Sequence, residues 1–346
     1  MAFSGKFFLL TLALLIVAGA VGAQSDEPAM LRVMQLSYVL HVSATIDIRV
    51  DEAVIFEGIG FPFATDYVEL APGDHTLTTM IADQRDATAT VPIALEPGHR
   101  YSVVIEGDYT DGVTFVTVDE TALLAEGGGS SAIIVNLSGQ PISDIAVDGE
   151  AALESVGPDS YGLLPLPAKE VVISGKVGDQ TYSETFTPHS NTEFLIAVRQ
   201  MPSGEPQITY HRSSPLTIAE YLRSIGQGAQ FSGIVGHVGG TDLLESLTDE
   251  GQYTLFLPTN DVLSRLTIPS DGGVVRDLLL GHVIPQRLPP YDLPDHQSLT
   301  TLAGNMVSLD FSETASGYWE IGGVPILWDV RLANGVIYAI DGIVAP

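Results

Sequence analysis

The residues of this chain that could do chemistry are its histidines and its paired carboxylates. The eight histidines are scattered, and no two stand at metal-ligand spacing on one predicted element. The pairs Asp47/Asp51 and Asp108/Asp111 could associate weakly with a divalent cation such as Ca²⁺, although so acidic a chain places such pairs on solvated faces anyway. No nucleophile elbow, phosphate loop, dinucleotide-binding or zinc-protease pattern occurs. We therefore expect no enzymatic activity and no cofactor.

The composition restricts the partners further. Acidic residues number 43 against 14 basic ones, which gives a formal net charge of -29. A surface of this sign repels phosphate backbones and anionic membranes, so nucleic acid is not an expected partner. The chain has no Cys, which excludes thiol catalysis and disulfides. Its domains must be stabilised by burial of apolar side chains.

The first 23 residues have the pattern of a secretory signal peptide. Lys6 supplies a positive charge, residues 7–18 form a short apolar run, and Val21-Gly22-Ala23 offers small residues for cleavage before Gln24. An uncleaved N-terminal anchor is the alternative. No second apolar segment follows, so we expect no transmembrane segment in the mature chain and a secreted or cell-surface location.

The elements that position these residues are strands throughout the first two thirds. Residues 44–51 alternate apolar and polar side chains, which predicts a strand with one face in water. Ala-Pro-Gly at 71–73 and Pro-Gly at 97–98 predict hairpin turns. Residues 126–131, EGGGSS, predict a flexible linker. We expect all-β sandwich-like domains at 24–125 and 132–210.

The second predicted β domain reads as a degenerate repeat of the first. VMQLS (33–37) corresponds to IVNLS (134–138), and Asp47 and Asp51 correspond to Asp144 and Asp148. Residues 30–201 resemble a family of β-sandwich domains of unknown function found in bacterial exported proteins, often in tandem. This resemblance implies an architecture and no chemistry.

The last third has helical as well as strand patterns, which predicts a separate α+β domain at 211–346. Ile218, Tyr221, Leu222 and Ile225 have the spacing of one buried helix face, behind a capping box of Thr217 and Glu220. Further helices are predicted near 230–238 and 242–247. The whole chain is thus expected to be multi-domain, with two sandwiches followed by an α+β domain.

Three segments of this last third carry a family resemblance. YTLFLPTNDVL (253–263), GHVIP (281–285) and NGVIYAIDGIVAP (334–346) are similar, in order, to the conserved boxes of the fasciclin domain, an extracellular adhesion module. The matching residues are Phe256, Pro258, Thr259, Asn260, His282, Pro285, Asn334, Gly335, Ile340 and Asp341. We expect a structural role for them, in which Thr259, Asn260, His282 and Asp341 satisfy buried backbone groups and helix caps.

The resemblance leads to a functional hypothesis. It implies adhesion, with an extracellular protein or glycan bound through the fasciclin-like domain. Tyr291, Asp292 and Asp295 are expected to form an exposed loop that could contact a partner, although the neighbouring prolines equally suit a rigid connector. Gly281 stands where the family usually has the Tyr linked to integrin binding, so that receptor is not implied. The alternative is a module that holds a small apolar or glycan ligand between its sheet and helices.

Overall fold

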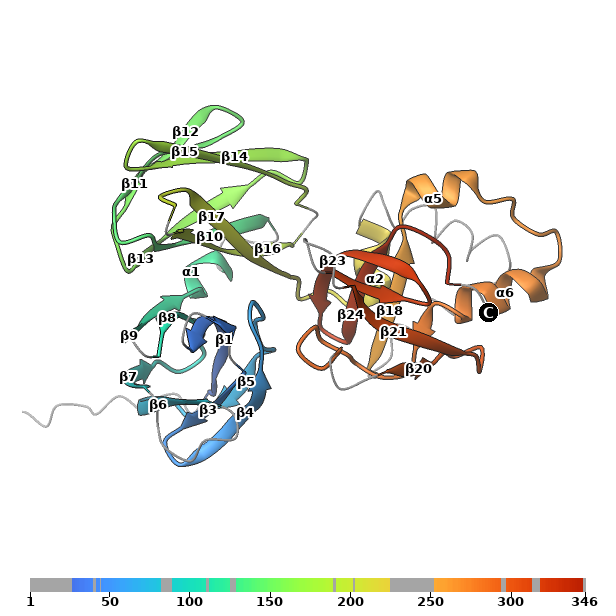
Figure 1. The fold of residues 1–346 in the computed structure, drawn as a ribbon, viewed down its shortest axis with the longest axis horizontal. Helices are drawn as coiled ribbons and strands as arrows, with labels where there is room; N and C mark the ends of the chain where they lie inside the picture. Colours follow the sequence, from blue (N-terminus) through green and yellow to red (C-terminus); the bar gives the residue numbers. More distant parts are fainter. Residues whose placement is uncertain are drawn as a thin grey trace, which may run out of the picture.

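The computed structural model describes residues 27–39, 42–43, 45–81, 89–109, 112–124, 129–188, 191–201, 203–224, 252–293, 297–312 and 318–344. Two stacked β-sandwiches and a C-terminal α+β domain beside them make up this part of the chain (Figure 1). The predicted signal peptide, the helices expected near 230–238 and 242–247, and residues Asp111 and Asp295 lie outside the described residues.

The first sandwich consists of two sheets. One contains β1 (Ala29–Val39), β2 (Val42–Ser43), β5 (Val68–Leu70), β8 (Arg100–Asp108) and β9 (Gly112–Asp119), and a short helix, α1 (Thr121–Leu124), follows it. The other contains β3 (Ile46–Val50), β4 (Ala53–Ile59), β6 (Gly73–Ile81) and β7 (Ala89–Leu95). Leu31, Val33 and Val103 of the first sheet pack against Ile48 and Leu77 of the second. The alternating burial along β3 is the pattern that its sequence predicts.

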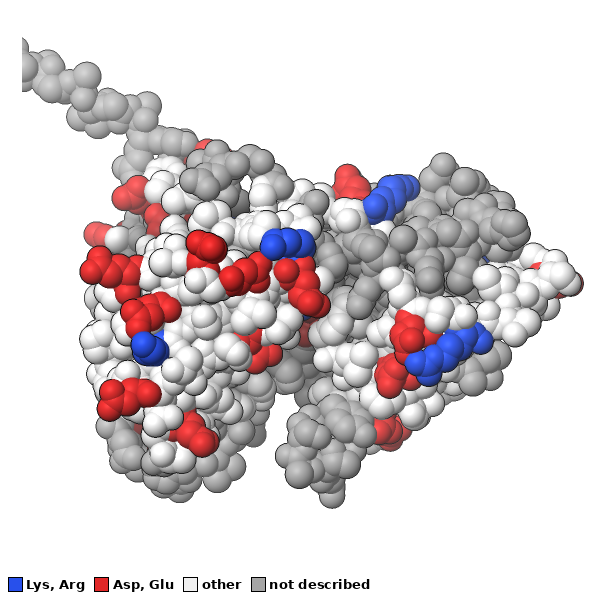
Figure 2. All heavy atoms as spheres, turned by 90° about the horizontal axis from the view of Figure 1, so that it is seen from above, with Lys and Arg blue, Asp and Glu red and all other residues white. Residues whose placement is uncertain are grey.

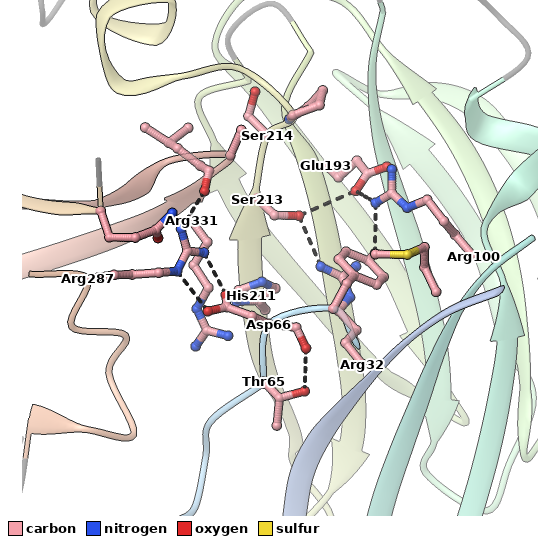
Figure 3. A pocket seen from close by; sticks show the side chains of 16 residues that line it. Arg32, Thr65, Asp66, Arg100, Glu193, His211, Ser213, Ser214, Arg287 and Arg331 are labelled. Carbon is pink, nitrogen blue, oxygen red and sulfur yellow. Dashed lines mark hydrogen bonds and ion pairs between the residues drawn. The ribbon is translucent and has the colours of Figure 1, made fainter. Parts of the chain in front are cut away.

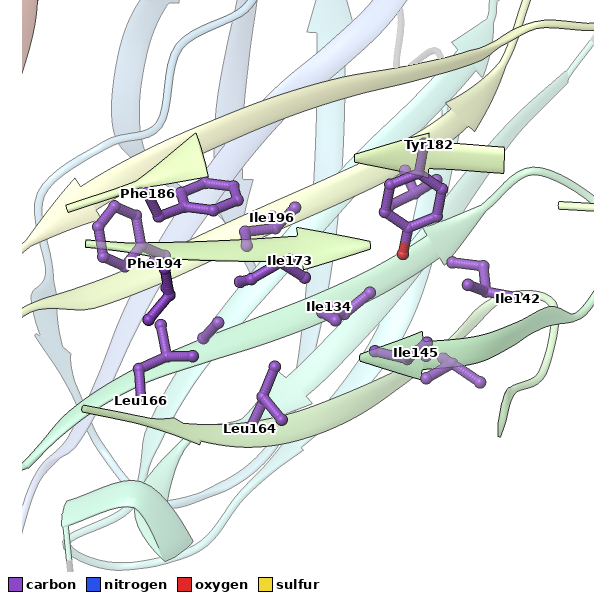
Figure 4. Packing of buried hydrophobic residues seen from close by; sticks show 14 of the residues in the cluster. Ile134, Ile142, Ile145, Leu164, Leu166, Ile173, Tyr182, Phe186, Phe194 and Ile196 are labelled. Carbon is purple, nitrogen blue, oxygen red and sulfur yellow. The ribbon is translucent and has the colours of Figure 1, made fainter. Parts of the chain in front are cut away.

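The second sandwich repeats this arrangement. Its first sheet contains β10 (Ser130–Leu137), β13 (Ser160–Leu166), β16 (Glu193–Gln200) and β17 (Pro206–Ser213). Its second sheet contains β11 (Ile142–Val147), β12 (Glu150–Val156), β14 (Val171–Val177) and β15 (Gln180–Phe186). Aliphatic side chains of both sheets fill the space between them, closed at one end by the edge-to-face pair of Phe186 and Phe194 (Figure 4).

The two sandwiches have the same strand connections. β1 runs parallel to β8 in the first, and β10 runs parallel to β16 in the second. The turns after β3 and β11 also correspond, because Asp51 and Asp148 both adopt a positive φ, 55° and 52°. Each carboxylate then accepts a 2.9 Å bond from a backbone N–H of the neighbouring strand, at Thr76 and Val172. Asp tolerates this left-handed conformation better than most residues because its short polar side chain bonds locally.

The two sandwiches are packed against each other rather than strung on a linker. The sheet containing β1 and the sheet containing β10 face one another across an apolar cluster that includes Met34, Val104, Ile133, Val135 and Leu195. Every residue of β10 is consequently buried. The segment expected to be a flexible linker also ends earlier than predicted, because β10 begins at Ser130. The four sheets form one continuous stack.

The C-terminal domain consists of helices and strands arranged around β24. Its helices are α2 (Ile218–Ser224), α5 (Asn260–Arg265) and α6 (Gly272–Leu280). Its strands are β18 (Tyr253–Pro258), β19 (Val283–Ile284), β20 (Ser298–Thr300), β21 (Met306–Ser312), β22 (Tyr318–Ile321), β23 (Val324–Leu332) and β24 (Gly335–Ile340). One face of β18 and β24 packs against the three helices, and the other packs against β20 to β22. The predicted fold class, two sandwiches followed by an α+β domain, is confirmed.

The start of α2 follows the predicted capping box. Thr217 donates its backbone N–H and its hydroxyl to a Glu220 carboxylate oxygen, both at 2.8 Å, and its hydroxyl accepts from the Glu220 N–H at 3.3 Å. The reciprocal bonds satisfy donors that the first helical turn leaves open. Ile218, Tyr221 and Leu222 are buried as their spacing predicts, and Ile225 lies outside the described residues.

A strand contact joins the second sandwich to the C-terminal domain. β17 runs parallel to β23 where Ser213 lies opposite Arg331. The Ser214 N–H donates to the Arg331 carbonyl at 2.8 Å, and the Ala333 N–H donates to the Leu216 carbonyl at 3.0 Å. The sheet of the second sandwich thereby continues into the C-terminal domain.

Candidate functional site

The first box residues build a strand-to-helix turn. Pro258 ends β18, Thr259 accepts a 3.4 Å bond from the Val262 N–H as the N-cap of α5, and Asn260 is the first helical residue. The buried Phe256 ring stacks on Tyr338 of the parallel strand β24, with centroids 5.5 Å apart. These contacts are internal and place none of the four predicted residues in a ligand site.

His282 is a structural residue. Its Nδ1 lies 2.8 Å from the Leu278 carbonyl near the end of α6, and its Nε2 accepts a 3.1 Å bond from the Val344 N–H. This pair of contacts requires the neutral ring with the proton on Nδ1. Burial lowers the pKa of His282, although its bond to Leu278 acts in the opposite direction. The ring therefore ties the end of α6 to the segment after β24.

Asn334 and Gly335 form a turn that could not be built from most other residues. The Asn334 side-chain oxygen accepts a 2.8 Å bond from the Ile218 N–H at the start of α2. A Cβ at Gly335 would lie 2.2 Å from the Tyr253 carbonyl oxygen. Glycine is required here by the close approach of β18.

Two of the motif residues lie on the surface. Pro285, just after β19, is exposed, and so is Asp341, whereas Ile340 is fully buried. The expectation that the Asp341 side chain satisfies a buried backbone group is wrong. Its backbone N–H donates to the Pro325 carbonyl at 3.1 Å, and the side chain points to solvent because β24 has ended.

The loop that was expected to be exposed for a partner is partly buried inside the molecule. The Tyr291 ring lies 5.4 Å from the Arg331 guanidinium, and its hydroxyl is 3.5 Å from an Asp66 carboxylate oxygen of the first sandwich. Burial raises the pKa of Tyr291 to about 12. Asp292 is half-buried. Tyr291 is thus a contact between domains, and no pattern in the sequence predicts this contact.

All three domains meet around a cavity of about 450 Å³ (Figure 3). Four arginines line it: Arg32, Arg100, Arg287 and Arg331. The remaining lining residues come from the first sandwich, from β16, β17 and the segment after them, and from the C-terminal domain: Met30, Thr65, Asp66, Tyr67, Glu193, His211, Ser213, Ser214, Pro215, Gln252, Leu332 and Ala333. We call this the junction cavity.

One wall of the junction cavity joins the two sandwiches. The buried Arg32 side chain donates to Glu120 at 2.8 Å and to Ser213 of β17 at 3.0 Å. Arg100 donates to Glu193 of β16 at 2.9 Å and to the Tyr67 hydroxyl at 2.8 Å. Both guanidinium groups lie over the Tyr67 ring, at 4.6 and 4.5 Å from its centroid. Burial raises the pKa of Tyr67 well above its usual value, so this hydroxyl stays protonated.

The opposite wall joins the first sandwich to the C-terminal domain. Arg287 donates to both carboxylate oxygens of Asp66, at 2.9 and 2.8 Å, and also to the Leu332 carbonyl at 2.7 Å. Arg331 donates to the Ala64 carbonyl. Burial alone would raise the pKa of Asp66, but the bonds to Arg287 and the charge of Arg331 lower it overall. Asp66 is therefore held as a carboxylate.

His211 of β17 lies between these two walls. It is 7 % exposed, and its pKa falls well below the usual value because of burial and because Arg331, Arg32 and Arg212 surround it. The Arg212 guanidinium lies over Phe194 of the second sandwich and Trp328 of the C-terminal domain, 5.1 and 4.7 Å from the ring centroids. The cavity thus combines a neutral imidazole with several cations.

The junction cavity was not predicted from the sequence. Its residues come from segments more than 200 positions apart, since Asp66 and Arg287 are separated by 221. One signal was present: Arg32 and Arg331 stand inside apolar strand segments, LRV and VRL, of a chain that has few basic residues. A cation within an apolar run is seldom buried without a partner, and so points to a buried contact.

The other predicted contacts are not assembled into a site. No group of three or more potential metal-ligating residues occurs among the described residues. Asp47 accepts a bond from the Gly58 N–H, and Asp51 accepts bonds from Thr76 and His75.

Figure 2 shows acidic side chains spread over one face of the molecule with few basic ones between them. In the ranges that the structure describes, no helix is both long and apolar enough to cross a membrane.

Curated relatives are similar to parts of this chain. Protein sll1483 of Synechocystis sp. is 24% identical over 160 residues, which cover 44% of this chain and 87% of that protein. Stabilin-1 of Mus musculus is 27% identical over 63% of this chain, and transforming growth factor-beta-induced protein ig-h3 of Sus scrofa is 31% identical over 32% of it. The matches span only 9% of stabilin-1 and 17% of the ig-h3 protein.

Solved structures and family models complete the comparison. A putative cell adhesion protein from Bacteroides ovatus is 9% identical and covers 54% of this chain and 96% of its own, but its TM-score of 0.19 carries no argument. The family model of the Fasciclin domain matches residues 229–346, and that of a domain of unknown function, DUF4397, matches residues 29–145 and so runs past the first sandwich into β10 and β11. The chain therefore contains a domain of the DUF4397 family, followed by a fasciclin domain toward its C-terminal end.

Proposed function

We propose that this chain is an exported surface or extracellular-matrix protein that mediates adhesion through its fasciclin domain, with a protein or glycan as partner. The observation that carries the proposal is the fasciclin domain at residues 229–346. The high negative charge supports an extracellular protein or glycan rather than nucleic acid as the partner. The signal-peptide pattern of residues 1–23 supports export.

We propose that the contact surface includes the aromatic pair Phe311 and Trp319 on β21 and β22. Phe311 is 54 % exposed, and its ring lies edge-to-face with Trp319 at 5.1 Å. Exposure of an aromatic side chain to water is unfavourable, and aromatic side chains are enriched at surfaces that a partner covers. Tyr291 and Asp292, by contrast, are engaged at the junction or half-buried, so they are poor candidates for the main contact.

The second functional hypothesis, a small ligand held between the sheet and helices of the fasciclin domain, has less support. The helices α2, α5 and α6 pack on β18, β23 and β24 through a shared apolar cluster that includes Leu222, Leu255, Leu263 and Ile337. The junction cavity lies outside this cluster, and charged and polar residues line it together with apolar ones. A ligand of the junction cavity would have to pair with its arginines, unlike the small apolar ligand of this hypothesis.

The adhesion proposal is tested with the full-length protein. Surfaces are coated with wild type or with the Phe311→Ser variant, and attachment is measured for cells of the organism that carries the chain and for a glycan array. We expect the variant to retain much less material than wild type. The matched control is Val172→Ser, which removes a 40 % exposed apolar side chain from the second sandwich and leaves binding unchanged.

Two results would count against the proposal. Equal attachment to wild type, Phe311→Ser and an uncoated surface would contradict adhesion as a function. Strong attachment that Val172→Ser abolishes and Phe311→Ser preserves would move the contact surface to the sandwiches. Export is tested separately, by detecting the protein outside the cell with an N-terminus at Gln24.

A further inference from the structure

The junction cavity has an excess of positive charge in a chain whose net charge is -29. Arg32, Arg100, Arg287 and Arg331 line it, against two lining carboxylates, Asp66 and Glu193, and a third, Glu120, bound behind them to Arg32. His211 adds no charge because its imidazole is neutral. These groups leave a surplus of one positive charge, and a negative group there would be stabilised.

Several arginine donors in the cavity wall have no bond to the described residues. The side-chain bonds of Arg100 to described residues all leave from Nη2, and the only such bond of Arg331 leaves from Nη1. Arg331 is 4 % exposed, and its Nε has no hydrogen-bond partner among the described residues. Buried donors without acceptors are costly, so a ligand that supplies acceptors would relieve this cost.

The rest of the lining indicates the ligand class. Ser213, Ser214 and Gln252 provide hydroxyl and amide groups, while Met30, Pro215 and Leu332 provide apolar surface. A volume of about 450 Å³ lies within the range of small-molecule sites. The small charge surplus suits a monoanion better than a phosphate, which carries close to two negative charges. The planar guanidinium fork also pairs bidentately with a carboxylate, as Arg287 already does with Asp66.

We propose that the junction cavity binds a small hydroxylated organic carboxylate, of the size and kind of a sugar acid, between the three domains. The carboxylate accepts from Arg331, and the hydroxyl groups bond on the opposite side, to Arg100, Ser213 and Gln252. Because residues of both sandwiches and of the fasciclin domain line the cavity, the ligand contacts all three and stabilises their arrangement. This site is distinct from the adhesion surface on β21 and β22.

The experiment is isothermal titration calorimetry on the full-length protein with glucuronate, glucose and inorganic phosphate as probes. We expect glucuronate to bind with one site per chain, and glucose to bind at least tenfold more weakly because it lacks the carboxylate. The Arg331→Gln variant should lose about tenfold or more in glucuronate affinity. Arg276→Gln, which removes an exposed arginine from α6, should bind as wild type does.

A second variant tests the site even if Arg331→Gln does not fold. Ala333 is exposed at the rim of the cavity, so Ala333→Phe narrows the cavity without changing a charge and should also weaken glucuronate binding. Folding of each variant is checked by urea unfolding. Tighter binding of phosphate than of glucuronate would overturn the carboxylate assignment. Absence of binding to any probe, or equal binding by wild type and Ala333→Phe, would overturn the site.

Discussion

Asp66 and Arg287 form a two-pronged ion pair across the junction of the first sandwich and the fasciclin domain, with N–O distances of 2.9 and 2.8 Å. Their side chains are 27 % and 20 % exposed, so the pair is largely shielded from solvent. Arg287 also binds two backbone carbonyls of its own domain, those of Leu332 and Gly335. The guanidinium is thus fixed before it reaches Asp66, which limits the entropy lost on pairing.

The Asp66→Asn variant should lower the free energy of unfolding by about 2 kcal/mol, because it removes a charged acceptor from a guanidinium that remains partly buried. Urea unfolding of the full-length protein measures the effect. The matched control is Asp261→Asn, which breaks the exposed pair of Asp261 and Arg265 within α5. Exposed pairs contribute little, so that variant should unfold as wild type does. Equal losses of unfolding free energy in the two variants would show that the junction pair stabilises the protein no more than the exposed pair does.

The same pair predicts a pH dependence. The pKa of Asp66 in the folded protein lies below its usual value of about 4, so its stabilising effect is complete above that pH and is lost as the pH falls through the lower folded pKa. The difference in unfolding free energy between wild type and Asp66→Asn should therefore be constant from pH 7 to 5 and shrink toward pH 3. A difference that grows as the pH falls would contradict this assignment.

Gly335→Ala should destabilise the fasciclin domain by about 1–3 kcal/mol or more, because the new methyl group overlaps the Tyr253 carbonyl of β18. The Cα of residue 335 and the Tyr253 carbonyl both belong to the backbone, so neither can move without breaking the pairing of β18 and β24. Thermal unfolding checks the prediction. Gly157→Ala serves as control, since a Cβ there meets no atom within 4 Å. A Gly335→Ala protein as stable as this control would contradict the close approach.

His282→Phe should lower the unfolding free energy, because the Leu278 carbonyl and the Val344 N–H lose their partner, at about 1–3 kcal/mol for each buried group. The folded pKa of His282 is lowered, so the advantage of wild type over the variant is complete above about pH 6.5 and is lost as the pH falls through the lower folded value. Urea unfolding between pH 8 and 5 follows this. A wild-type advantage that increases at low pH would mean that the ring is charged in the folded protein.

The fasciclin domain could be predicted because its signals are local. The capping box of Thr217 and Glu220, the N-cap at Thr259 and the turn at Asn334 and Gly335 each depend on residues close together in the chain. Each segment specifies its own geometry, so the pattern survives without knowledge of the partner strand. The exposure of Asp341 could not be predicted, because the sequence does not show where β24 leaves the core.

The packing of the sandwiches against each other could not be read from the turn patterns. β10 and β16 are buried on both faces, and their central residues, 132–135 and 194–198, are continuously apolar rather than alternating. Such a run is typical of a strand covered on both sides, but it does not identify what covers it. The role of Tyr291 was hidden for a related reason, since its contacts Asp66 and Arg331 come from two different domains.

The parallel pairing of β1 with β8 and of β10 with β16 has a consequence for the path of the chain through the two sandwiches. In each pair the hydrogen bonds form a ladder between strands that point the same way. β9 follows β8, and β17 follows β16, in the antiparallel direction, so the chain returns to the end of the sheet at which β1 and β10 begin. The chain thus enters and leaves each sandwich at the same end, beside the junction cavity, whose lining includes Met30 and Ser213.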